Sequence, residues 1–167
     1  MITRIYIDNF RCFSSFELKP DRVNLLIGNN GAGKSAFVEA VHGVVALVAM
    51  GAAVEDEFPA ETRTRWDSRP LQRIELDVSG NGGVYHYVVE ISHDPPGQAV
   101  RIEREMVEYL PTEVMGLGSV LFLYKDGKVE LHNNQGKLGT EFAFRGGRSF
   151  LPQLQGSARE FAAYVVS

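Results

Sequence analysis

The sequence predicts an α/β domain in which one core strand of a parallel sheet leads through a glycine-rich loop into a helix, and an antiparallel β-meander follows. Three observations predict this arrangement. The apolar run VNLLIG at 23–28 has the near-continuous hydrophobicity of a strand that is buried on both faces. Apolar residues then recur with helical spacing over 37–48. Residues 69–132 alternate apolar and polar side chains between turn signals.

Two shorter strand patterns precede the core strand. Ile5 and Ile7 alternate with Tyr6, which is the period of a half-buried strand. The run FEL at 16–18 places two apolar side chains on one face of a second strand. The Pro-Asp pair at 20–21 predicts the turn that separates these strands from the core strand.

The helix expected after the loop is apolar on most of its surface. Phe37, Val41, Val44 and Val48 form one stripe, and a helix with so wide an apolar surface is usually buried. Gly43 lowers the helix propensity. A helix is still expected, because a glycine-rich loop between a strand and a helix is the arrangement that uses this motif.

Residues 69–132 predict a meander of about five antiparallel strands. The stretch GNGG at 80–83 supplies one hairpin turn, since Asn and Gly tolerate positive φ angles. Asp126 and Gly127 supply another. The expected parts of this single domain are 1–50 for the N-terminal strands, loop and helix, 51–68 for a loop, 69–145 for an antiparallel β subdomain, and 146–167 for the start of a helical segment.

Residues 28–35, GNNGAGKS, fit the pattern G-x-x-x-x-G-K-[ST] of a phosphate-binding loop. Glycines let backbone N–H groups converge on a polyphosphate without obstruction, and the N-terminus of the following helix adds unpaired N–H groups. Lys34 adds a positive charge for the β- and γ-phosphates, and Ser35 offers a hydroxyl to Mg²⁺. The residues expected to bind the nucleotide are Asn29, Asn30, Gly31, Ala32, Gly33, Lys34, Ser35 and Ala36, with Lys34 as the catalytic cation.

Two motifs resemble those of one ATPase lineage. The octet reads G-x-N-G-x-G-K-S, which resembles the Walker A motif of ABC-type ATPases. The element IDNFRCF at 7–13 resembles the I-x-N-F-[RK]-x-F element that closely precedes this motif in the RecF/SMC/OLD-like group of AAA-type ATPases. The resemblance extends over residues 1–50. It implies an ABC-ATPase-like P-loop NTPase lobe, bound ATP and Mg²⁺, a head-to-head homodimer, and a position for Arg11 near the nucleotide.

The resemblance also implies parts that the sequence does not show. No apolar run ends in the Asp-Glu pair of a Walker B motif, and no LSGG-like signature is present. Because the chain stops at Ser167, about where a helical subdomain is expected, we expect an N-terminal lobe whose hydrolytic activity needs a C-terminal half. Gln153 is the candidate for a glutamine that contacts Mg²⁺, and Gln155 competes for this role. We expect nucleotide binding with little or no turnover, because phosphoryl transfer needs several groups acting together.

Composition constrains partners and location only broadly. The net charge of −4 gives no overall attraction to nucleic acid, so nucleic-acid binding stays open. The longest apolar stretch, 43–54, has 12 residues and is too short to span a bilayer, and one cysteine fits a reducing compartment. A cytoplasmic protein is therefore expected. Arg63, Arg65, Trp66 and Arg69 form a basic–aromatic cluster that suits contact with adenine or a nucleic-acid backbone, or is simply a solvated loop.

Two functions from different classes follow from these observations. The first is the ATP-binding head of an ATPase that works in DNA repair, chromosome maintenance or defence. The second is a non-catalytic interaction module, in which ATP orders the β lobe for a protein partner without being hydrolysed. A small P-loop kinase or GTPase ranks last, because the chain has no N-K-x-D base-reading motif and no arginine-rich lid.

Overall fold

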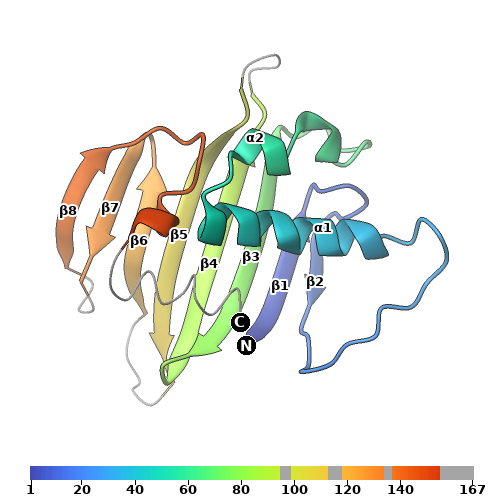
Figure 1. The fold of residues 1–167 in the computed structure, drawn as a ribbon, viewed down its shortest axis with the longest axis horizontal. Helices are drawn as coiled ribbons and strands as arrows, with labels where there is room; N and C mark the ends of the chain where they lie inside the picture. The colour runs from blue at the N-terminus through green and yellow to red at the C-terminus, as the bar shows by residue number, and fades with distance from the viewer. Residues whose placement is uncertain (95–98, 113–117, 134–136, 155–167) are drawn as a thin grey trace.

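The computed structural model describes residues 1–94, 99–112, 118–133 and 137–154, and its main feature is one eight-stranded sheet (Figure 1). The strands are β1 (Ile2–Asp8), β2 (Phe16–Leu18), β3 (Leu71–Gly80), β4 (Gly83–Ser92), β5 (Arg101–Pro111), β6 (Ser119–Lys125), β7 (Lys128–His132) and β8 (Leu138–Ala143). They lie in the order β2-β1-β3-β4-β5-β6-β7-β8. Each of the seven pairs of neighbours is antiparallel.

The prediction of an α/β fold with a parallel core strand was wrong. Residues 23–28 lie in the loop between β2 and the first helix, where Val23, Leu25 and Ile27 are 88%, 81% and 83% exposed. The N-terminal strands and the meander form one antiparallel sheet, because β1 pairs with β3. An apolar run becomes a buried strand only where neighbouring strands accept its backbone hydrogen bonds. Within the described residues, β1 has β2 and β3 at its two edges, and no strand lies beside 23–28.

The meander expected over 69–132 is present as β3 to β7, and β8 extends it. Asn81 and Gly82 have φ angles of 50° and 71°, and Asp126 and Gly127 have φ angles of 52° and 75°. Positive φ at both central residues matches the right-handed twist of the strands that each turn joins. Local turn chemistry therefore fixes the register of both hairpins.

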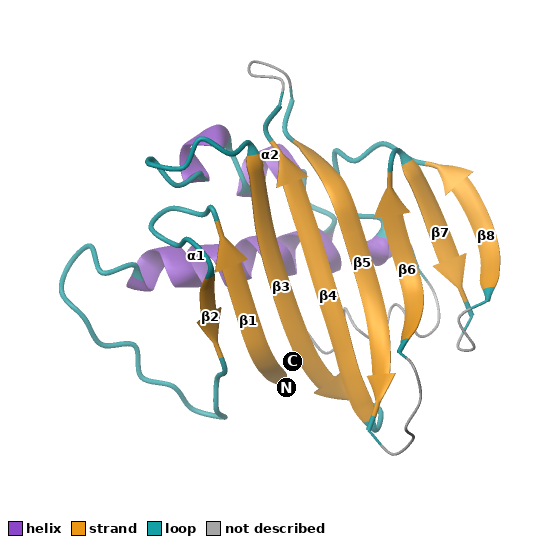
Figure 2. Ribbon diagram, turned by 180° about the vertical axis from the view of Figure 1, so that it is seen from behind, coloured by secondary structure: helices purple, strands orange, loops and turns teal. Residues whose placement is uncertain are grey.

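All described helices cover one face of the sheet, as Figures 1 and 2 show from opposite sides. They are α1 (Lys34–Val45), continued by the π-helical segment η1 (Ala46–Met50), then α2 (Val54–Glu57) and the 3₁₀ segments η2 (Ala60–Thr62) and η3 (Leu151–Gln153). Val44 and Leu47 of this helical layer are fully buried with Leu76 of the sheet. A Cβ added to Gly43 would lie 2.8 Å from the Phe58 ring, which explains a glycine in mid-helix. Within the described residues, no helix combines the length and hydrophobicity of a membrane span.

The opposite face of the sheet carries paired charges. Arg4 donates hydrogen bonds to Glu17 at 2.9 Å and to Glu75 at 2.7 Å. Arg73 likewise bridges Glu75 and Glu90, at 2.7 Å each. These ladders cover the polar face of the sheet with long side chains whose charges are already compensated.

One buried carboxyl joins the sheet to the chain that follows β8. Glu105 of β5 is 1% exposed and accepts hydrogen bonds from the Tyr87 hydroxyl at 2.9 Å and the Ser149 hydroxyl at 2.7 Å. The backbone N–H of Phe150 also donates to it. Burial outweighs these donors and raises the pKa of Glu105 to about 7.

This carboxyl makes stability depend on pH. A group whose pKa rises on folding holds its proton more tightly in the folded state. The free energy of unfolding is therefore highest below the ordinary pKa of 4.5 and decreases as the pH rises to about 7. The total loss of unfolding free energy is about 3 kcal/mol.

Glu105→Gln keeps an acceptor for Tyr87 and Ser149 without a charge, so this part of the pH dependence should disappear. Urea unfolding of both proteins at pH 5 and pH 8 measures it, and equal pH slopes would contradict the assignment.

Candidate nucleotide site

The glycine-rich loop leads directly into α1, and two of its glycines are required by geometry. Gly31 and Gly33 have φ angles of 83° and 92°, which residues with a Cβ rarely adopt. A Cβ at Gly33 would also lie 2.7 Å from Cys12 Sγ and 3.3 Å from the Phe13 ring. The loop can therefore pack this closely on residues 12–13 only with glycine at position 33.

Lys34 closes the loop on itself. Its ammonium group donates to the backbone oxygens of Gly28 at 2.6 Å and Asn29 at 2.9 Å. Among the described residues it has no carboxylate partner, so its charge is not compensated. The first turn of α1 contains no acidic residue, and no side chain caps its N–H groups. The positive end of the helix dipole and an ammonium group without a carboxylate partner thus meet at one loop, which is an arrangement suited to a multiply charged anion.

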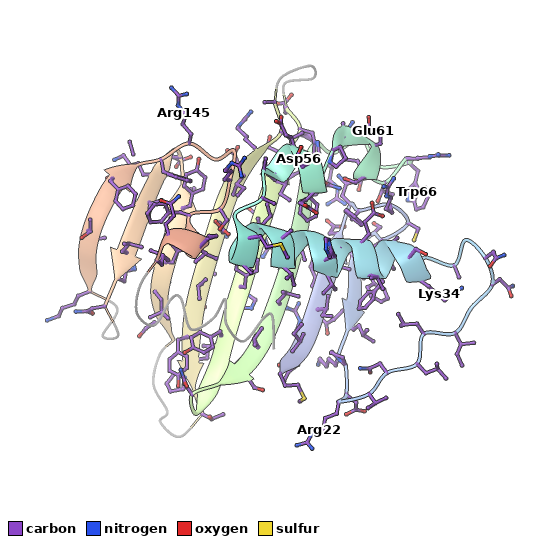
Figure 3. All side chains as sticks on the ribbon, viewed as in Figure 1. Arg22, Lys34, Asp56, Glu61, Trp66 and Arg145 are labelled. Carbon is purple, nitrogen blue, oxygen red and sulfur yellow. The ribbon has the colours of Figure 1, made fainter. Side chains whose placement is uncertain are left out.

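The remaining loop residues leave this place open to solvent. Asn29, Asn30, Gly31, Ala32 and Ser35 are all exposed, and Ala36 is half-buried. Figure 3 shows Lys34 at the end of α1 where the helix begins, away from the bulk of the sheet. A phosphate chain can therefore approach the loop without displacing other parts of the protein.

Ser35 is the residue at this site that fits a magnesium ion. Its hydroxyl lies in the first turn of α1, one residue after the ammonium-bearing Lys34. The described residues contain no cluster of three or more His, Cys, Asp or Glu side chains that could hold a metal. Mg²⁺ in phosphate sites is commonly held by few protein ligands together with substrate phosphates and water, so one hydroxyl fits that chemistry.

The element IDNFRCF at 7–13 is the support on which the loop rests, and Asn9 is its centre. Asn9 is fully buried with a φ angle of 56°. Its side-chain amide donates to the backbone oxygens of Arg69 and Leu71, and its side-chain oxygen accepts from the N–H of Thr64 at 3.1 Å. Phe10 and Phe13 then exchange backbone hydrogen bonds across a tight turn. This turn brings Cys12 and Phe13 against Gly33.

Arg11 lies beside α1, but its guanidinium group is engaged. It donates to both carboxylate oxygens of Glu39, at 3.1 Å and 2.6 Å, and to the backbone oxygen of Glu61. The hydrogen bonds to Glu39 raise the pKa of Arg11. Arg11 thus fastens the 7–13 element to the helix that follows the loop, so a contact with nucleotide would require it to leave Glu39.

Gln153 does not come together with Ser35. It lies in η3, which packs against η1 at the opposite end of the helical run that begins at Lys34. At about 1.5 Å per residue, η1 lies roughly 16 to 23 Å from Ser35. Gln155 lies outside the described residues. Residues 52–57, AAVEDE, contribute the helix α2, and residues 120–125, VLFLYK, lie in the hairpin strand β6, as the hairpin expected around Asp126 and Gly127 requires.

Several residues that shape the site carry no motif of their own. The carboxylate of Glu39 accepts hydrogen bonds from Arg11. Thr64 donates to the Asn9 side chain and to the backbone oxygen of Phe13. Cys12 packs on Gly33. The only signal in the sequence is Asn9 itself, since asparagine tolerates a left-handed backbone better than most residues. The other contacts join residues far apart in the chain and leave no local pattern.

The N-terminal residues of this chain are similar in sequence to known proteins. Residues 1–46 match the family described as AAA ATPase domain. The DNA replication and repair protein RecF of Shewanella pealeana is 43% identical over 42 residues, and that of Shewanella woodyi is 45% identical over 42 residues. Each alignment covers 25% of this chain and 12% of the relative, so the chain spans a small part of the length of either protein. The N-terminal part of this chain is therefore similar to AAA ATPase domains and to the matching segment of RecF proteins.

Proposed function

We propose that this chain is the ATP-binding lobe of a RecF/SMC/OLD-like ATPase, with the triphosphate held by residues 28–35 and Mg²⁺ by Ser35. The observation that carries the proposal is the combination of an uncompensated Lys34 with an uncapped helix N-terminus. Left-handed glycines at 31 and 33 let the backbone between them follow an anion closely. The matched family supports a nucleotide as that anion.

We extend the proposal to the biological role, oligomeric state and location of the protein. The relatives are named DNA replication and repair proteins, which supports a role in DNA repair or maintenance. We also propose a head-to-head homodimer in the cytoplasm. Direct nucleic-acid contact has less support, because Arg4 and Arg73 on the open face of the sheet are already paired with glutamates.

Binding without turnover is the behaviour that the described residues favour. Hydrolysis needs a group that orients the attacking water and further charges that stabilise the transferred phosphoryl group. Lys34 and the loop amides supply the charge, but within the described residues no carboxylate contacts Lys34 or Ser35. We propose that full activity requires residues beyond those described.

A second function, a nucleotide-dependent protein-interaction module, is favoured by the apolar side chains before the loop. Val23, Leu25 and Ile27 are among the most exposed apolar side chains described. Adjacent exposed apolar residues are typical of protein contact surfaces. This segment ends at Gly28, whose carbonyl accepts from Lys34, so a partner bound there would respond to nucleotide.

Removal of the ammonium group tests the main proposal. We expect Lys34→Ala to weaken Mg·ATP binding roughly 10- to 100-fold, because a charged hydrogen-bond donor is lost from the phosphates. Titration calorimetry with ATP and with GTP measures the change. Lys19→Ala removes an equal charge from an exposed position and should bind ATP as the parent does. Equal affinity of Lys34→Ala and the parent would refute the phosphate-loop assignment.

Removal of the Ser35 hydroxyl tests the metal ligand separately. Ser35→Ala should bind metal-free ATP with the parent's affinity but lose most of the gain that Mg²⁺ provides, because the hydroxyl contacts only the ion. Calorimetric titrations with and without Mg²⁺ give this difference. Ser14→Ala is the matched control on an exposed hydroxyl. A Ser35→Ala protein with an undiminished Mg²⁺ effect would remove Ser35 from the metal site.

The interaction-module alternative makes its own prediction. The double variant Leu25→Ser/Ile27→Ser should keep the parent's stability, since both side chains are exposed, but bind less of a hydrophobic dye. If nucleotide controls this surface, Mg·ATP should change dye fluorescence in the parent and not in Lys34→Ala. Dye binding that is insensitive to ATP would argue against this alternative while leaving the ATP-binding proposal in place.

A further inference from the structure

We infer that Trp66 is the platform on which the base of the bound nucleotide stacks. This inference rests on the proposed function, because it needs phosphates held at residues 28–35. It assigns a role to the aromatic member of the basic–aromatic cluster. The ligand class is a purine nucleoside triphosphate, recognised through the flat face of its base.

Trp66 is not held by the core. Its side chain is 71% exposed, and it is the one aromatic side chain among the large apolar residues that the described structure leaves exposed. Arg69 of the same cluster, by contrast, is bound by Asp8 and Asp67. An exposed indole ring offers a large flat surface at little conformational cost.

The backbone that carries Trp66 is nevertheless fixed. Arg65 and Trp66 are the central residues of a turn closed by a hydrogen bond of 3.1 Å from the N–H of Asp67 to the oxygen of Thr64. Thr64 is anchored by Asn9 and by the backbone oxygen of Phe13. Asp67 is anchored through Arg69, which also binds Asp8. The ring is thus presented on a pre-organised turn rather than on a loose loop, which lowers the entropic cost of binding.

The Trp66 turn and the phosphate loop both contact the same residue, Phe13. Phe13 accepts a hydrogen bond from Thr64 on one side, and its ring contacts Gly33 on the other. Figure 3 shows Trp66 and Lys34 at the same end of the molecule, with Trp66 on the loop beyond α1. A nucleotide whose phosphates occupy the loop must extend its ribose and base away from it. Trp66 is the exposed aromatic side chain of the described residues that these contacts connect to the loop.

The Trp66 turn can bind a nucleotide base by stacking, without hydrogen bonds to the edges that distinguish one base from another. Stacking on an aromatic ring accepts any base, because every base has a π-face. The neighbouring Arg65 is exposed and has no ion-pair partner among the described residues, so it can add charge near the ribose and α-phosphate. We therefore expect affinity from this turn, with little discrimination between adenine and guanine.

The protein carries its own probe, because Trp66 is its single tryptophan. Mg·ATP and Mg·GTP should quench the intrinsic fluorescence, whereas inorganic tripolyphosphate, which has no base, should bind without quenching. Trp66→Ala should weaken ATP binding about tenfold, within the range for one base stacked on an aromatic ring, and leave tripolyphosphate binding unchanged by calorimetry. Trp66→Phe should retain most of the ATP affinity. Met50→Ala, which removes another exposed apolar side chain at the far end of the helical run, should bind ATP as the parent does.

The outcomes separate this inference from the proposed function. Lys34-dependent ATP binding that Trp66→Ala leaves unchanged would overturn the inference and leave the proposed function standing. If neither ATP nor tripolyphosphate binds the parent, both fail. If a single-stranded DNA oligonucleotide quenches the fluorescence and ATP does not, Trp66 contacts nucleic acid instead and the inference is overturned.

Discussion

The buried amide of Asn9 is the constraint on which the rest of this end of the protein depends. Its left-handed backbone turns the chain at the end of β1, and its side chain satisfies three backbone groups in the segment 64–71. Aspartate would tolerate the same backbone but could not donate to two carbonyl oxygens. The turn fixed in this way places Cys12 and Phe13 under Gly33, so the geometry of the phosphate loop is set by a residue that does not belong to it.

The parts of the fold that the sequence predicts are those determined by near neighbours. The hairpin at 80–83 follows from Asn-Gly chemistry, and the strands on both sides follow from alternation over a few residues. The segment 23–28 has an equally strong apolar pattern, yet it is not a strand. A hydrophobic pattern indicates that a segment should be buried. It does not identify the segment that supplies its backbone hydrogen-bond partners. That information is nonlocal, and the single-sheet arrangement could not be predicted without it.

The same distinction applies to the candidate site. Gly31, Gly33, Lys34 and Ser35 act within one turn of the chain, so their spacing alone predicts their arrangement. Arg11 was expected near the nucleotide from a motif, but its partner Glu39 lies 28 residues away and is not marked by any pattern. Gln153 was considered for its residue type, whereas its position follows from the packing of η3 against η1. A motif predicts an arrangement of residues where they are near neighbours, and tertiary packing decides the rest.

The exposed apolar segment and the phosphate loop are covalently continuous, and this continuity has a thermodynamic consequence. Gly28 ends the apolar run and also accepts a hydrogen bond from Lys34. A partner that covers Leu25 and Ile27 would restrict the backbone of Gly28, and a triphosphate bound by the backbone N–H groups of 28–35 would order the same loop. Each event then lowers the ordering cost of the other, and linkage requires the coupling to be equal in both directions. Under the proposed interaction-module function, nucleotide binding and protein association would therefore influence each other through this loop.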